Sequence, residues 1–194
     1  SLPLVPMEAC LTLSSLAACV VRSLVIALRP WRGKGAMEID GVDLGCLVRR
    51  ATNEARRSGD MLLDKRIYYC AGWLARNIRV TRWLYPFENR AFEKMLLLGV
   101  RSRSPETEMV GYQHASITLS HTNFILHADE AKYTPLPDSI LTTGEVITRW
   151  LEGGGNYPEG IFKTACALRQ GQQAEAPAKA PRAAKTRVLA ALAT

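Results

Sequence analysis

The feature that constrains this chain most is a 20-residue apolar stretch, residues 9–28, which contains a single charged side chain, Arg22. As an α-helix, a segment of this length spans about 30 Å, the thickness of the hydrocarbon core of a bilayer. Backbone groups in lipid must be hydrogen-bonded within their own segment, so a crossing segment would have to be helical. The stretch therefore predicts an N-terminal hydrophobic helix that is a candidate transmembrane span.

The residues that flank this stretch indicate an orientation. Basic residues and an aromatic residue follow it at once, and they are Arg29, Trp31, Arg32 and Lys34. Basic flanks mark the cytoplasmic or matrix side of a span, and aromatic rings gather at the membrane interface. The segment that precedes the stretch, residues 1–8, has no basic residue. We therefore expect these four residues to contact lipid headgroups, with the bulk of the chain on the inner side.

Two other interpretations of the apolar stretch remain open. Arg22 would cost about 2.5–3.5 kcal/mol near the centre of a span, unless its side chain reaches back to the interface. A helix buried in protein has a similar composition. A targeting segment is the third interpretation, although a secretory signal begins with basic residues and this one does not.

The charge of the chain is unevenly distributed. The net charge is +7, but residues 29–103 carry +8, residues 104–160 carry −6, and residues 161–194 carry +5. Such asymmetry favours an anionic partner, which is nucleic acid, lipid headgroups or an acidic protein surface. Internal pairing between the basic and acidic segments is the other interpretation.

The cysteine pattern excludes several classes of protein. There are five cysteines, an odd number, and they form no Cys-x-x-Cys motif. A disulfide-stapled secreted domain, a zinc ribbon and a thioredoxin-type site are therefore disfavoured. The pattern is typical of a reducing compartment.

The basic middle of the chain has the periodicity of helices. Apolar residues at helical spacing predict one amphipathic helix from Leu44 to Ser58, a second after Asp60, and a third from Pro86 to Gly99. Arginine and aromatic residues alternate here, as they do in RNA sites, at membrane surfaces and in packed helices. Three arginines are assigned as phosphate or lipid contacts, and they are Arg76, Arg79 and Arg82.

The acidic segment predicts one short β-hairpin, because apolar and polar residues alternate over residues 115–120 and a second strand follows at 124–127. His121 and His127 are the candidate metal ligands of this segment. Their spacing fits no standard ligand pattern, and the hairpin would hold them apart. We therefore assign no metal, no cofactor and no catalytic residue.

Taken together, the sequence predicts a mainly α fold in four regions. Residues 1–34 form the hydrophobic, candidate transmembrane helix with its basic flank, and residues 35–103 form a small amphipathic helical bundle. Residues 104–168 form the acidic segment with the hairpin, and residues 169–194 form an extended low-complexity tail rich in Ala, Pro and Lys.

The function expected from this organisation is that of a non-catalytic accessory or structural subunit in a large organellar membrane complex. A respiratory or ATP synthase assembly of the mitochondrial inner membrane is an example, with the bulk of the chain on the matrix side. Its expected partners are other protein subunits and anionic lipid, with no small-molecule substrate. The alternative is a nucleic-acid-binding structural protein, ribosomal or capsid-like, that uses the basic helices and the tail.

Overall fold

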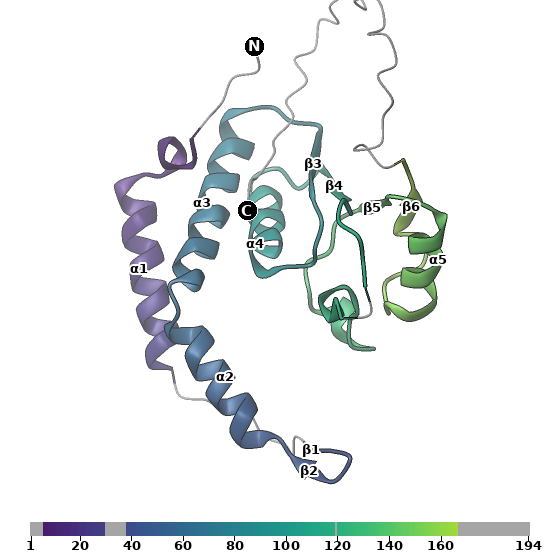
Figure 1. The fold of residues 1–194 in the computed structure, drawn as a ribbon. Helices are drawn as coiled ribbons and strands as arrows, with labels where there is room; N and C mark the ends of the chain where they lie inside the picture. Colours follow the sequence, from purple (N-terminus) through teal and green to yellow (C-terminus); the bar gives the residue numbers. More distant parts are fainter. Residues whose placement is uncertain (1–5, 30–37, 119, 167–194) are drawn as a thin grey trace, which may run out of the picture.

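The computed structural model describes residues 6–29, 38–118 and 120–166, which contain five α-helices and a four-stranded parallel sheet (Figure 1). The helices are α1 (Leu13–Leu28), α2 (Gly45–Arg57), α3 (Asp60–Asn77), α4 (Ala91–Arg101) and α5 (Glu145–Gly154). The sheet strands are β3 (Arg82–Pro86), β4 (Glu108–Tyr112), β5 (Ser139–Thr142) and β6 (Phe162–Thr164). The shorter elements are a hairpin of β1 (Glu38–Ile39) and β2 (Val42–Asp43), and the 3-10 turns η1 (Met7–Cys10), η2 (Thr122–Phe124) and η3 (Glu130–Lys132).

This architecture contradicts the prediction of a mainly α fold with one hairpin. The strand order is β3-β4-β5-β6, and all neighbouring pairs are parallel. Parallel neighbours need a crossover connection, which α4 provides between β3 and β4 and α5 provides between β5 and β6. The hairpin predicted over residues 115–127 does not form, because this segment belongs to the long crossover from β4 to β5 and folds into η2.

The third predicted helix begins later than expected. Trp83, Tyr85 and Phe87 alternate along the chain and are all buried, so their side chains point to one side of a strand. Pro86 therefore closes β3 instead of opening a helix, and α4 begins at Ala91. The helices expected on either side of Ser58 and Gly59 are confirmed as α2 and α3.

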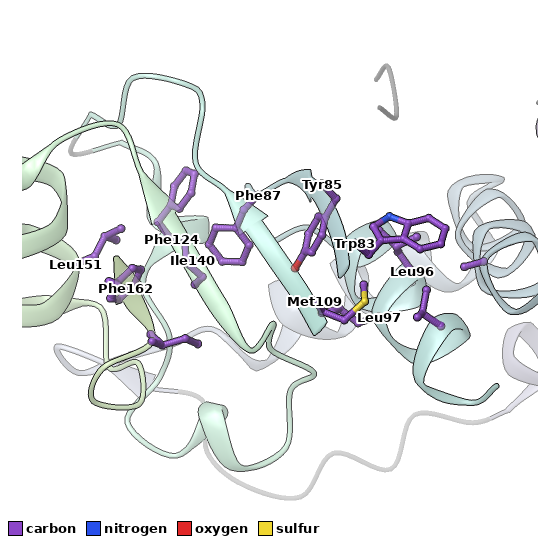
Figure 2. Packing of buried hydrophobic residues seen from close by; sticks show 13 residues of the cluster. Trp83, Tyr85, Phe87, Leu96, Leu97, Met109, Phe124, Ile140, Leu151 and Phe162 are labelled. Carbon is purple, nitrogen blue, oxygen red and sulfur yellow. The ribbon is translucent and has the colours of Figure 1, made fainter. Parts of the chain in front are cut away.

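The core of the molecule lies between the sheet and its crossover helices (Figure 2). The aromatic side chains of β3 are packed in one cluster with apolar residues of α4, β4, β5, α5 and β6. The labelled members of this cluster are Trp83, Tyr85, Phe87, Leu96, Leu97, Met109, Phe124, Ile140, Leu151 and Phe162. Burial of this much apolar surface is the main force that holds the sheet and its helices together.

Two glycines allow α3 and α4 to cross closely. A Cβ atom on Gly99 would lie 2.4 Å from the carbonyl oxygen of Tyr68, and a Cβ on Gly72 would lie 3.2 Å from the carbonyl oxygen of Gly99. No larger residue fits at position 99 unless the helices separate. Helix α3 thus packs on α4, and α1 packs in turn on α3, so the sheet, α4, α3 and α1 follow one another across the molecule (Figure 1).

The transmembrane prediction is wrong for the described residues, none of whose helices is long and apolar enough to cross a membrane. Helix α1 has only 16 residues, because Thr12 caps it and separates it from η1. The Thr12 hydroxyl accepts a hydrogen bond from the Ser15 amide at 3.2 Å, and the Ser15 hydroxyl accepts one from the Thr12 amide at 2.9 Å. Residues 30–37, which hold three of the four predicted flanking residues, and the tail from 167 onward lie outside the described residues.

Candidate functional site

The carboxyl ends of the four parallel strands meet along one edge of the sheet, which we call the carboxyl edge. Its residues are 87–89 after β3, 113–114 after β4, 143–144 after β5 and 165–166 after β6. In open α/β sheets, ligands bind in the crevice outside this edge. The side chains that gather here are therefore the first candidates for a functional site.

Glu88 and His114 are brought together by the register of β3 and β4. Pro86 pairs with Tyr112, so the residues two positions further along each strand leave the sheet side by side. The Glu88 Oε1 atom lies 3.8 Å from the His114 Nε2 atom, and both side chains are partly exposed, at 21% and 29%. The other carboxylate oxygen of Glu88, Oε2, forms an ion pair with the Nε atom of Arg90 at 2.7 Å. One carboxylate oxygen and one imidazole nitrogen thus stand next to each other at the protein surface.

The second imidazole nitrogen of His114 is in a different environment. Its Nδ1 atom is buried and has no hydrogen-bond partner among the described residues. A carboxylate beside one ring nitrogen favours the proton on that nitrogen. We therefore assign the proton of the neutral ring to Nε2, where it points toward Glu88, and a lone pair to the buried Nδ1.

A buried carboxylate fixes the loop that carries Glu88. Glu93 is 1% exposed, and it accepts hydrogen bonds from the amides of Glu88 at 2.9 Å and Asn89 at 3.0 Å. Burial raises the pKa of Glu93 to about 7, although these hydrogen bonds favour its ionised form. Asn89 has a φ of 57°, in the left-handed region, and the bond to Glu93 holds it there.

Two further hydrogen bonds hold the loop after β3 against η2. The Asn89 carboxamide donates to the carbonyl oxygen of Asn123 at 2.7 Å, and the Asn123 carboxamide donates to the carbonyl oxygen of Glu88 at 2.5 Å. This reciprocal pair joins the loop after β3 to η2. The backbone of Glu88 is therefore held by Glu93 through its amide and by Asn123 through its carbonyl oxygen.

Gln113 holds the loops after β4 and β5 together in a similar way. Its side chain is fully buried, and its Oε1 atom accepts hydrogen bonds from the Thr143 amide at 3.2 Å and the Thr143 hydroxyl at 3.0 Å. Its Nε2 atom donates to the carbonyl oxygen of Ala115. Gln113 therefore connects the segment that carries His114 to the start of α5.

An apolar hollow opens beside these loops, between the segment after His114 and the first turns of α5. Its volume is about 630 Å³. Its lining is mostly apolar, and consists of Ile117, Thr118, Ser120, Val146, Ile147 and Trp150. Concave apolar surface next to a few polar groups is typical of small-molecule sites.

The two histidines proposed as metal ligands do not form a site. His121 is exposed, and its Nδ1 atom accepts a hydrogen bond from the Thr118 amide at 3.0 Å. His127 Nδ1 accepts one from the Asp129 amide at 3.4 Å. Among the described residues, no three His, Cys, Asp or Glu side chains are grouped so that they could hold a metal ion.

The residues predicted to contact phosphate or lipid are dispersed. Arg29 ends α1, and its carbonyl oxygen accepts a hydrogen bond from Arg56 at 2.9 Å. Arg82 pairs with Glu108 at 2.6 Å, and Arg79 is exposed in the turn between α3 and β3. Arg76 lines a hollow, which is described below. Trp31, Arg32 and Lys34 lie outside the described residues.

Comparison of the chain with models of protein families, with curated proteins and with solved structures gave no match. What the carboxyl edge can bind therefore follows from its own side chains. They offer a carboxylate and an imidazole in one place, carboxamides that hold them there, and an apolar wall with an indole ring.

Proposed function

We propose that the carboxyl edge binds a hydroxyl-bearing small molecule, of the class of sugars and nucleosides, through hydrogen bonds to one of its hydroxyl groups. The observation that carries this proposal is the 3.8 Å separation of Glu88 Oε1 and His114 Nε2. The separation is too long for a hydrogen bond between them. A ligand oxygen can instead lie about 2.8 Å from both atoms at once.

The two side chains would then have different tasks. His114 donates a hydrogen bond from its Nε2 atom to the ligand oxygen, because its other nitrogen is buried and has no partner among the described residues. Glu88 Oε1 accepts a hydrogen bond from the same ligand hydroxyl. Hydrogen bonds to charged groups contribute about 1.5–3 kcal/mol each.

The surroundings of the pair support this ligand class. The indole ring of Trp150 and the aliphatic residues of the hollow offer an apolar surface for a ring face. This arrangement favours a small-molecule binding protein over the accessory subunit expected from the sequence. That expectation took its main support from a membrane span, and α1 is not one.

The test is a titration of the full chain with D-ribose, D-glucose and adenosine, followed by NMR signals of the histidine rings. We expect at least one probe to shift the His114 signals while those of His127, which lies outside the site, stay in place. Glu88→Gln removes the charged acceptor and should weaken binding at least fivefold. The matched change Glu152→Gln, at an exposed position of α5, should leave binding unchanged. If no probe moves the His114 signals, or if both variants bind alike, the proposal is wrong.

A further inference from the structure

A second hollow lies on the opposite side of the fold from the carboxyl edge. It is formed by the start of α1, the last turns of α3 and the turn after α4, and its volume is about 460 Å³. Helix α4 begins at the carboxyl edge and ends here, one helix length away. Three arginines line it, and they are Arg22, Arg76 and Arg103. We call it the arginine hollow.

The arginines of this hollow have no carboxylate partners in the described part of the chain. No acidic side chain of the described residues lines the hollow either. In contrast, Arg82 and Arg101 at the same end of the sheet both form ion pairs, with Glu108 and Asp138. The guanidinium of Arg22 lies 5.9 Å from the centre of the Tyr69 ring, a cation–π contact that leaves its N–H groups available. Positive charge is thus concentrated in a concave place without being neutralised.

The other lining residues are mostly polar. They include Thr12, Ser14, Ser15 and Ser102 and two tyrosines. The Ser15 and Ser102 hydroxyls already donate to the carbonyl oxygens of Thr12 and Gly99, so the arginines are the principal donors of the hollow. The N-terminus of the 16-residue helix α1 begins there, and its first turn contains no acidic residue. The positive end of the helix dipole therefore adds to the field of the three arginines.

Gly72 also lines the hollow, where α3 approaches the turn after α4. A Cβ atom at this position would lie 3.6 Å from the Arg103 side chain and 3.7 Å from the Ser102 hydroxyl, which is ordinary van der Waals contact. The side chains of Arg103 and Ser102 therefore lie close to the α3 backbone at the wall of the hollow.

We propose that the arginine hollow is a binding site for a phosphate group, of the phosphomonoester or diphosphate type. Guanidinium groups form paired hydrogen bonds with phosphate oxygens. Three guanidinium groups around one concave site favour a compact group over an extended polymer, which would need a row of contacts along a surface. The site is independent of the function proposed for the carboxyl edge. The phosphate can belong to a soluble molecule or to a lipid headgroup.

The test is calorimetric titration of the full chain with inorganic pyrophosphate at low ionic strength. We expect binding that weakens as salt is added, because exposed charges are screened. Arg22→Gln, Arg76→Gln and Arg103→Gln should each weaken binding about tenfold or more. Arg79→Gln removes the same charge from a neighbouring exposed position outside the hollow, and it should change affinity less than twofold. Because all four side chains are exposed, the variants should keep the unfolding midpoint of the original chain.

Vesicles distinguish the two sources of phosphate. Cosedimentation with phosphatidic acid vesicles, but not with phosphatidylcholine vesicles, would assign the site to a lipid headgroup if the same three variants abolish it. Binding of pyrophosphate without binding of either vesicle would assign it to a soluble ligand. The proposal is overturned if neither pyrophosphate nor phosphatidic acid binds. It is also overturned if Arg79→Gln weakens binding as much as the other variants do, since the effect would then be one of net charge.

Discussion

Helices α1 and α4 have apolar sequences of similar kind, yet the protein uses them in opposite ways. Helix α4 buries five of its residues between α3 and the sheet, whereas α1 buries only Cys19 among its described side chains. Leu24 and Val25 of α1 are 56% and 59% exposed, while Leu96 and Leu97 of α4 are 2% and 1% exposed. The apolar content of a segment therefore does not determine its burial. What decides it is the number of other elements that pack around the helix.

The same contrast separates two regions of the molecule. The outer region consists of α1, α2 and the β1–β2 hairpin, and α2 has no buried residue. The inner region consists of the sheet with α3, α4 and α5, and it holds the main core cluster. We infer that the free energy of unfolding comes mainly from the inner region, and the following predictions test this difference.

The largest effect is expected from one substitution made in both regions. Leu97→Ala in α4 removes a fully buried side chain and should lower the free energy of unfolding by about 2–5 kcal/mol. Leu24→Ala in α1 removes an exposed one and should change it by less than about 0.5 kcal/mol. Urea unfolding followed by circular dichroism measures both. Equal losses would abolish the distinction between the regions.

The pH dependence of stability should originate in the inner region. Burial raises the pKa of Glu93 from its ordinary value of 4.5 to about 7. Between these values the folded state holds a proton that the unfolded state has released, so the free energy of unfolding falls as pH rises, by about 3 kcal/mol in total. Glu93→Gln should remove this fall. If the free energies of unfolding of the original chain and the variant change in parallel from about pH 4 to pH 8, the prediction is wrong.

A row of hydroxyl groups in the inner region should contribute a smaller amount. The Thr148 hydroxyl lies 2.6 Å from that of Thr142 and 2.8 Å from that of Thr164, and so joins α5 to β5 and β6. Thr148→Val keeps the shape but removes the link, at a cost of about 1–3 kcal/mol. Thr52→Val in α2 should cost less than about 0.5 kcal/mol. Faster hydrogen exchange of the β5 and β6 amides in the first variant alone would locate the effect.

The smallest effect is expected from an ion pair of the outer region. Arg50 and Glu54 pair at 2.9 Å on the exposed surface of α2, one helical turn apart. Such pairs contribute about 0.3–0.5 kcal/mol and weaken in salt. Glu54→Gln should therefore shift the thermal midpoint by no more than a degree or so, and the shift should vanish at high salt. A larger, salt-independent shift would mean that α2 is better packed than its exposure indicates.

The sequence was informative where a segment folds by its own periodicity. Helices α2 and α3 follow from apolar residues at helical spacing and from the break at Ser58 and Gly59. The strands β4 and β5 were missed because they are short and their central positions are mostly buried on both faces, which leaves no alternation to detect. Strand β6 was missed because it has only three residues, of which only Phe162 is buried. The alternation of Trp83, Tyr85 and Phe87 was present in the sequence, and could have identified β3.

The candidate site could not be predicted in the same way. Glu88 and His114 are 26 positions apart, and only the register of β3 with β4 makes them neighbours. The histidines singled out from their proximity in sequence, His121 and His127, lie in turns that their own side chains stabilise. The arginine hollow likewise depends on three different helices or their ends. Which of these residues become neighbours depends on the strand order and on how the helices cross. The spacing of residues along the sequence does not contain this information.

In the sheet order β3-β4-β5-β6, the loops at the carboxyl edge lie in the same order in space as in the sequence. Because the strands succeed one another in a single direction, the loops at 88, 114, 143 and 165 are arranged in space as they are in sequence. Neighbouring strands are about 4.8 Å apart, so the first and last loops are separated by about 14 Å. A bound ligand that contacts only residues 88 and 114 must be short. A ligand that also contacts residue 165 must extend across the whole sheet. The set of loop residues that a ligand contacts on this edge therefore indicates the length of the ligand.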